Sequence, residues 1–291
     1  MLKFIATYYS ISALSVAIIS FLIGTFVVRK NIKKALNRAF FFWSFAVCLW
    51  AVFYFIWQIE IEAKPALLWT RLLMIGAIWA PVFYLKVVIL FLDIKKVKQK
   101  IILYADYFLA TLFTILLITP LMVDRVEPTL GFLFWPKPGL AYGPFLIMFM
   151  GTTIYSFYLA IKTFLNKELS ATKRSQIIYF LFSFAITIVG GSTNYFLWYN
   201  IPIKPYGNIL VLAYFFGTTY AIIRYQLMDI RIIARKSTVF LILSGFVYAC
   251  FFGATRLLNN MFGSIYNREA MIFGIFIALA FVLAFIWFEK L

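Results

Sequence analysis

The stretch FIATYYSISALSVAIISFLIGTFVV, residues 4–28, holds no charged side chain, and Arg29 and Lys30 follow it directly. A helix of roughly 20 residues, at about 1.5 Å per residue, crosses the hydrocarbon core of a bilayer, which is about 30 Å thick. Backbone groups inside lipid must hydrogen-bond to one another, and barrel strands would be shorter and alternate in polarity. The stretch therefore predicts a membrane-spanning helix. Because it is longer than the apolar part of a signal peptide, we expect it to be retained.

Eight more predominantly apolar stretches follow, each 17 to 27 residues long. The nine together cover residues 4–28, 39–59, 66–92, 101–122, 143–165, 176–199, 207–223, 238–255 and 270–288. Hydrophobic residues make up 65% of the 291-residue chain, more than a single soluble core would bury, whereas lipid favours this composition. We predict an all-α fold, a polytopic transmembrane bundle of about nine helices.

The positive charges follow the odd-numbered stretches. Four turns hold most of the 27 basic residues: Arg29, Lys30, Lys33, Lys34 and Arg38; Lys95, Lys96, Lys98 and Lys100; Lys162, Lys167, Lys173 and Arg174; Arg224, Arg231, Arg235 and Lys236. This positive-inside pattern predicts an N-terminus outside and a C-terminus in the cytoplasm. The net charge of +17 is then explained by a lipid bilayer with anionic headgroups. Since the loops are short, we expect no nucleic-acid partner.

The longest loop, residues 123–142, lies on the predicted outer side and contains the apolar, turn-rich run GFLFWPKPG, residues 131–139. Such a run is typical of a short hairpin or of an amphipathic lid at the membrane interface. Two interpretations stay open: an aromatic anchor at headgroup level, or a cap over an outward-facing pocket.

Four residues near the predicted outer side form a candidate ligand-binding site. Gln58 ends the second stretch, Arg71 and Trp79 belong to the third, and Asn194 follows a Gly-Gly pair in the sixth. Together they would line a shallow pocket with a few polar groups in an aromatic wall, and Arg71 would suit an anionic or amphiphilic ligand. The alternative is ordinary hydrogen bonding between helices combined with aromatic anchoring.

Lys86 and Asp106 lie about ten residues before and after the middle of the third inner turn. In an antiparallel pair of helices they would reach a similar depth, so we predict an intramembrane ion pair between them. The alternative is a lysine that extends to the cytoplasmic headgroups and an aspartate near the interface with no further role.

The residue types that carry catalysis are scarce. The chain has no histidine, and its two cysteines, Cys48 and Cys250, lie inside separate apolar stretches. It also has no glycine-rich phosphate loop and no nucleophile elbow. We therefore expect neither an enzyme nor a cofactor or metal site.

The seventh stretch closes with YAIIRYQLMDIR, residues 220–231. This run resembles the end of the seven-helix membrane module at the N-terminus of many bacterial sensor histidine kinases. Trp69-x-Arg71-Leu72, Pro81 followed by an aromatic residue, and Arg174-Ser-Gln176 also resemble that module, and the resemblance covers residues 1–236. It implies a sensor in the bacterial cytoplasmic membrane that signals inward. Arg224, Tyr225, Asp229 and Arg231 would then form the output linker, although a plain interfacial connector is the alternative.

Residues 237–291 are similar to the two extra helices that some longer kinases of this kind carry. Because the 291 residues hold no phosphoacceptor histidine, we expect a non-catalytic sensor whose partner is a separate cytoplasmic kinase or other effector. Gly245, Ala249 and Gly253 recur at every fourth position, which favours close helix packing within the chain or across a homodimer. The alternative functions are a transporter or channel component and a structural or assembly protein.

Overall fold

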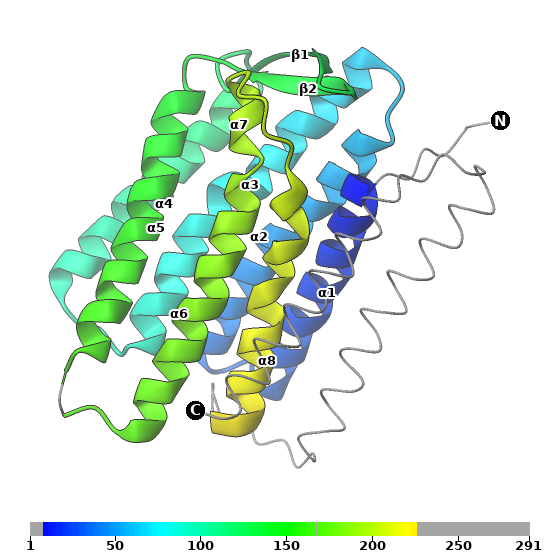
Figure 1. Cartoon of the computed structure of the whole chain (residues 1–291). Helices are drawn as coiled ribbons and strands as arrows, with labels where there is room; N and C mark the ends of the chain where they lie inside the picture. The colour runs from blue at the N-terminus through cyan, green and yellow to red at the C-terminus, as the bar shows by residue number, and fades with distance from the viewer. Residues whose placement is uncertain (1–7, 167, 226–291) are drawn as a thin grey trace, which may run out of the picture. The chain divides into compact units, whose positions relative to one another are not determined.

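The computed structural model describes residues 8–166 and 168–225, which belong to one compact unit. Seven helices run back and forth through it (Figure 1): α1 (Tyr8–Lys30), α2 (Ala35–Gln58), α3 (Ala63–Phe91), α4 (Val97–Leu116), α5 (Tyr142–Phe164), α6 (Ala171–Ser192) and α8 (Ala213–Tyr225). Four shorter elements complete it: the strands β1 (Val123–Thr129) and β2 (Phe132–Pro138), the helix α7 (Tyr195–Trp198) and the 3₁₀ helix η1 (Tyr206–Leu212).

Six helical segments in this part of the chain are long and apolar enough to cross a membrane: α1, α2, α3, α4, α5 and the continuous segment Ala171–Trp198. The prediction of a polytopic helical membrane bundle is therefore confirmed for residues 8–225. The eighth and ninth stretches, with the small residues of 245–253, lie outside the described residues. The count of nine helices and the separate unit 237–291 stay predictions.

The bundle is tightest where α2 packs against its sequence neighbours α1 and α3. Gly76 permits this approach, because a Cβ there would overlap the carbonyl oxygen of Ala46 and lie 2.5 Å from the backbone nitrogen of Trp50. Small residues at a helix contact let two backbones approach closely in lipid, where apolar side chains gain little by leaving the solvent. A glycine thus fixes the α2–α3 distance.

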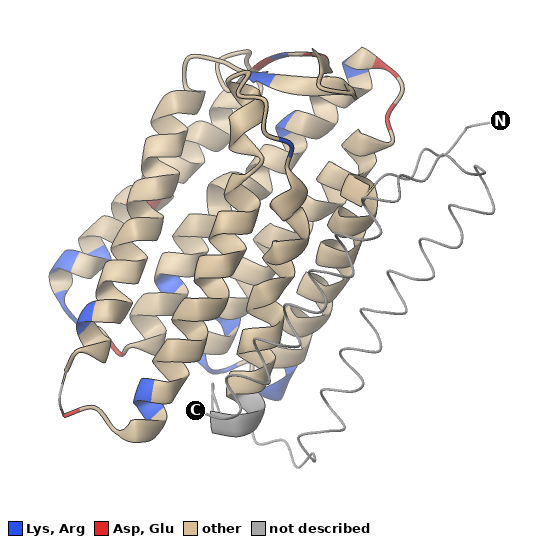
Figure 2. Cartoon of the chain, in the orientation of Figure 1, with Lys and Arg blue, Asp and Glu red and all other residues tan. Residues whose placement is uncertain are grey.

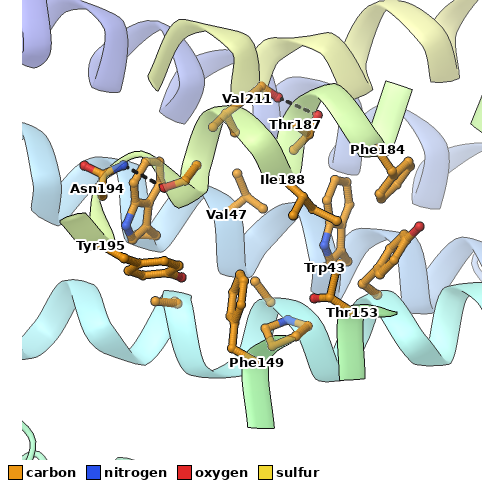
Figure 3. Close-up of a pocket in the computed structure, with 17 residues that line it drawn as sticks. Trp43, Val47, Phe149, Thr153, Phe184, Thr187, Ile188, Asn194, Tyr195 and Val211 are labelled. Carbon is orange, nitrogen blue, oxygen red and sulfur yellow. Dashed lines mark hydrogen bonds between the residues drawn. The ribbon is translucent and has the colours of Figure 1, made fainter. Parts of the chain in front are cut away.

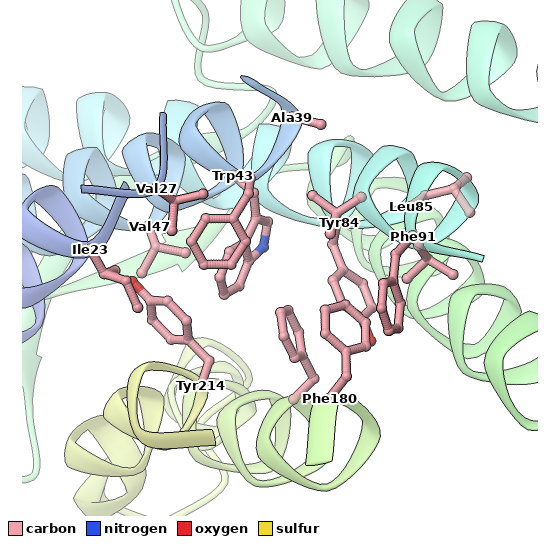
Figure 4. Close-up of a cluster of buried hydrophobic side chains, with 14 of the residues drawn as sticks. Ile23, Val27, Ala39, Trp43, Val47, Tyr84, Leu85, Phe91, Phe180 and Tyr214 are labelled. Carbon is pink, nitrogen blue, oxygen red and sulfur yellow. The ribbon is translucent and has the colours of Figure 1, made fainter. Parts of the chain in front are cut away.

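The side chains divide into a packed interior and a lipid-facing surface. Trp43, Tyr84 and Phe180 meet Tyr214 and the aliphatic residues of α1 and α2 in one buried cluster (Figure 4). On the peripheral helix α4, large apolar side chains spaced three to four residues apart stay exposed: Val97, Ile101, Tyr104, Phe108, Leu112 and Ile115. This spacing forms one helical face, as expected for a helix that borders lipid.

The seventh crossing is not one regular helix, contrary to the continuous span predicted for residues 207–223. It starts as the 3₁₀ helix η1 and becomes α-helical only at Ala213. A Cβ at Gly190 would lie 2.5 Å from the carbonyl oxygen of Gly207, so η1 is pressed against the end of α6. Further along, a Cβ at Gly217 would overlap the side chain of Ser183. Close contact with α6 therefore shapes both halves of this crossing.

Of the two alternatives for residues 131–139, a short hairpin or an amphipathic lid, the structure shows a hairpin, whose first strand begins earlier, at Val123. β1 pairs with β2 in antiparallel fashion, and Leu130 and Gly131 form the turn with φ values of 47° and 89°. Two successive positive φ angles are typical of the tight turns that join two strands. The indole N–H of Trp57, near the end of α2, donates a hydrogen bond of 2.6 Å to the carbonyl oxygen of Phe134. The hairpin is thus fastened to the bundle.

Charged side chains brace the hairpin from both strands. Glu127 lies 3.3 Å from the ammonium of Lys137, and the guanidinium of Arg125 donates to it at 3.1 Å. The Lys137 ammonium, which is buried, also donates to the side-chain oxygen of Asn200. Desolvation raises the pKa of Glu127, but the hydrogen bonds from Lys137 and Arg125 outweigh it, so the pKa is lowered overall.

Lysines and arginines gather at the end of the bundle opposite the hairpin (Figure 2). Within the described residues they are Arg29, Lys30, Lys33, Lys34, Arg38, Lys95, Lys96, Lys98, Lys100, Lys162, Lys173 and Arg174, in the turns after α1, α3 and α5. At the hairpin end, acidic and basic residues are mixed. The fold therefore collects the basic turns on one side.

Candidate functional site

A cavity of about 110 Å³ lies inside the bundle, walled by α2, α3, α5 and α6 and completed by α7, η1 and the residue before α7 (Figure 3). Its lining consists of Trp43, Val47, Trp50, Gly76, Ala77, Ala80, Pro81, Tyr84, Phe149, Thr153, Phe184, Thr187, Ile188, Gly191, Asn194, Tyr195 and Val211. Residues from six elements thus meet around one space.

Small residues on two helices create the room for this cavity. Gly76, Ala77 and Ala80 face it from α3, and Gly191 faces it from the last turn of α6. A Cβ at Gly191 would meet only the Val211 side chain, at 3.7 Å, which is an ordinary van der Waals contact. The room beside Gly191 is therefore not filled by neighbouring backbone, unlike the room beside Gly190.

The lining is aromatic and aliphatic, and none of its residues carries a formal charge. Burying an ion in such surroundings without a partner is strongly unfavourable, so the cavity suits an uncharged occupant. No group of three or more His, Cys, Asp or Glu side chains that could hold a metal occurs within residues 8–166 and 168–225.

An aromatic chain connects the cavity wall to α8. Phe184 packs against Trp43 and Tyr84 with ring centroids 4.7 Å and 4.4 Å away, and Trp43 meets Tyr214 edge-on at 4.4 Å. Ring pairs in this range contribute about 0.5–1.5 kcal/mol beyond their buried area. Since Tyr214 is the second residue of α8, Trp43 is in direct contact with the start of that helix.

Thr187 links the cavity to the same place by hydrogen bonds. Its hydroxyl accepts from the backbone N–H of Tyr214 at 3.0 Å and donates to the carbonyl oxygen of Ser183 at 2.9 Å. It also lies 3.4 Å from the carbonyl oxygen of Val211, the cavity residue in η1. The side chain of Thr187 therefore supplies the acceptor for a backbone donor at the η1–α8 junction.

Asn194 connects the outer end of the cavity to η1. Its side-chain amide donates to the carbonyl oxygen of Gly191 at 2.9 Å and to the side-chain oxygen of Asn208. Both asparagines are buried, and the Oδ1 atom of Asn194 has no hydrogen-bond partner in the part of the chain that the structure describes. Sequence reasoning selected Asn194 but missed Asn208.

Of the four residues predicted to bind a ligand, only Asn194 lines the cavity. The Arg71 guanidinium donates to the carbonyl oxygen of Val123 at 3.0 Å and so fastens α3 to the hairpin. The indole N–H of Trp79 donates to Thr114 at 3.1 Å, toward α4, and Gln58 ends α2. The structure does not gather the four into one pocket, and ligand binding by Arg71, Gln58 and Trp79 stays a prediction.

Among the described residues, the structure shows no ion pair between Lys86 and Asp106. The Lys86 ammonium lies 5.7 Å from the ring centroid of Tyr107, the residue after Asp106. Consecutive helical residues point about 100° apart, so a match in depth does not ensure a match in direction. Asp106 is buried, and its Oδ2 atom has no partner among the described residues.

The predicted output linker is only partly described. The backbone of Arg224 and Tyr225 completes α8. Asp229 and Arg231 lie outside the described residues. The sequence also gave no indication of Trp43 and Thr187, since both are single residues inside long apolar stretches.

The comparisons with known proteins agree with this architecture. No curated protein and no solved structure matches the chain. A family model described as the N-terminal 7TM region of histidine kinase matches residues 12–231, which is well over half of the chain and runs from the first turns of α1 past the end of α8. The resemblance drawn from residues 220–231 is thereby confirmed. The chain belongs to the family of N-terminal seven-transmembrane regions of histidine kinases.

Proposed function

We propose that this chain is the input module of a two-component system in the bacterial cytoplasmic membrane, and that it converts occupancy of the cavity into a movement of α8. The observation that carries the proposal is the shared boundary between the cavity and the first turn of α8. Trp43, Thr187 and Val211 all line the cavity. The first two contact Tyr214, and Val211 lies two residues before α8 begins.

The direction of signalling follows from the distribution of charge. Basic turns favour the cytoplasmic side of a membrane. We therefore assign the basic end of the bundle (Figure 2) to the cytoplasm and the hairpin end to the outside. α8 then runs inward from the cavity and ends at Tyr225, immediately before the rest of the family's closing motif.

The Thr187 contact is strong enough to bias a two-state equilibrium. A buried backbone donor that loses its acceptor costs about 1–3 kcal/mol. Coupling free energies between sites are typically of that size, which corresponds to a change of about 5- to 150-fold in an equilibrium constant. An occupant that breaks or strengthens the bond between Thr187 and Tyr214 would thus change the balance between two positions of α8. It must prefer one of the two, because equal affinity shifts nothing.

The catalytic step belongs to a partner in this proposal. The 291 residues contain no histidine, so a phosphoacceptor histidine would lie on a separate cytoplasmic kinase or in further sequence joined to this chain. The aromatic and aliphatic lining of the cavity also supports a sensor more than a path for polar solutes.

To test this, the catalytic core of a histidine kinase that is soluble and active on its own is fused to the full chain after Leu291, and the fusion is reconstituted in proteoliposomes. Thr187→Val removes the hydroxyl but keeps the shape, and Thr187→Ser keeps the hydroxyl as the matched control. We expect the rate of autophosphorylation to change at least fivefold with Val and less than twofold with Ser. Equal rates in three folded proteins would refute the coupling. Solute flux through the same liposomes would favour a transporter instead.

A further inference from the structure

We infer that the cavity binds a small, uncharged, single-ring aromatic molecule with one hydroxyl group, which arrives from the lipid phase. The binding itself follows from the cavity. That such a molecule acts as a signal rests on the function proposed above.

The size of the cavity limits the occupant to about one ring. Its volume is about 110 Å³. An apolar cavity of roughly 150 Å³ accepts benzene, so this smaller and partly open cavity would enclose no more than one ring and leave the ring's substituents at its mouth. Six rings stand in the lining, contributed by Trp43, Trp50, Tyr84, Phe149, Phe184 and Tyr195. Aromatic side chains favour edge-to-face and offset contacts with another ring, so this wall favours a flat aromatic occupant over a branched aliphatic one.

The polarity of the lining calls for one neutral hydrogen-bonding group. Two buried side chains of the lining have polar atoms without a partner among the described residues, the Oδ1 atom of Asn194 and the hydroxyl of Tyr84. Asn194 is 6% exposed and Tyr84 is 2% exposed. Unpartnered buried polar groups are unfavourable, and a hydroxyl, which both donates and accepts, would pair with either. A carboxylate or an ammonium would find no counter-ion in this lining.

The route from the lipid lies between α5 and α6. These two helices contact each other far less extensively than α2 contacts α3. Phe149 of α5 and Ile188 of α6 line the cavity and remain partly exposed. A neutral aromatic alcohol partitions into the bilayer, so the membrane would concentrate it beside this seam.

The test uses 4-bromobenzyl alcohol, whose bromine quenches tryptophan fluorescence on contact, with the full chain in lipid nanodiscs. Trp43 and Trp50 in the cavity wall act as reporters. Wild type should show a saturable component of quenching above the linear component that arises from probe dissolved in lipid. Benzyl alcohol should remove that component by competition, and benzoate at the same concentration should not.

Two variants fill the cavity and one serves as their control. Gly191→Leu and Ala80→Leu add a side chain at positions that line the cavity, from α6 and from α3. Gly151→Leu adds the same side chain on α5 where nothing lies within 4 Å of a Cβ. We expect the saturable component to weaken at least tenfold in both filled variants and less than twofold in the control. If one filled variant fails to fold, the other still decides.

Purely linear quenching in wild type, or saturable quenching that survives in a folded filled variant, would overturn the inference. Failure of the signalling role looks different. In the kinase fusion, 4-bromobenzyl alcohol would then bind saturably and leave autophosphorylation unchanged. Conversely, an effect of Thr187→Val on autophosphorylation without saturable quenching would retain the sensor and reject this class of occupant.

Discussion

Replacement of Trp57 by phenylalanine should loosen the outer hairpin. The indole N–H of Trp57 donates to the carbonyl oxygen of Phe134 at 2.6 Å, and its ring lies 5.0 Å from the ring of Trp135, which is fully buried. Phenylalanine keeps an aromatic ring at this place but leaves that carbonyl oxygen without its donor. An acceptor lost in such a setting costs about 1–3 kcal/mol. Because the hydrogen bond is only partly buried, we take the lower part of that range, about 1–2 kcal/mol.

This loss predicts the size of the effect. A change of about 1–2 kcal/mol corresponds to a factor of about 5–30 in the ratio of open to closed hairpin. Trypsin cleaves after Arg125 in β1 only when the strand opens, and cleavage tracks the open population when closing is fast. We therefore expect Trp57→Phe to raise the rate of cleavage after Arg125 about 5- to 30-fold, measured by mass spectrometry in detergent micelles.

Trp69→Phe is the matched control. The Trp69 indole N–H donates to the Glu60 carboxylate at 3.1 Å, so this hydrogen bond involves neither strand of the hairpin. Its loss should affect the junction of α2 and α3 and leave the hydrogen bond from Trp57 to the hairpin in place. The control should accelerate cleavage less than fivefold. If Trp57→Phe leaves cleavage unchanged, or if both variants behave alike, the reasoning about the anchored hairpin fails.

Three further results are expected. Gly76→Leu should destabilise the protein by roughly 3 kcal/mol or more because it forces α2 and α3 apart, whereas Gly151→Leu should have little effect, as thermal unfolding in detergent would show. Because the pKa of Glu127 is lowered in the folded protein, its stabilising effect is present above the unfolded pKa of about 4.3 and is lost as pH falls through the folded value. Hydrogen exchange of the hairpin amides, corrected for intrinsic rates, should therefore speed up below about pH 4 and not between pH 6 and 8. In bacterial cells, a cysteine placed at Gly131 should react with a membrane-impermeant maleimide and one placed at Lys33 should not; the reverse result would invert the assigned orientation.

Much of the membrane architecture could be predicted from the sequence, because lipid imposes simple requirements of length and polarity. The first apolar stretch, residues 4–28, became a helix at Tyr8–Lys30, and the second and third stretches likewise lie on α2 and α3 with ends shifted by a few residues. The hairpin was also foreseeable, since GFLFWPKPG combines turn residues with an apolar strand. These features depend on local pattern alone.

The candidate site depends on contacts that no local pattern encodes. In the sequence, Thr187 is a single polar residue inside an apolar stretch. Its role becomes visible only in the fold, where the backbone N–H of Tyr214, 27 residues later, donates to its hydroxyl. The break in the seventh crossing likewise needs Gly190 and Gly207 to meet. The Lys86 ammonium lies near the ring of Tyr107 and forms no ion pair with Asp106, because consecutive residues on a helix point about 100° apart. Rotation about a helix axis is the quantity that hydropathy leaves undetermined.

The contact between Gly217 and Ser183 limits how a stimulus can travel. Since a Cβ at Gly217 would overlap the Ser183 side chain, α8 packs closely on α6 at this point, and we expect this contact to oppose rotation of α8 about its own axis. If α8 moves as proposed, we expect it to shift together with α6 or to slide lengthwise along it. Under the proposed function, the conformational signal that reaches the cytoplasm would then be a displacement of α8 along the membrane normal.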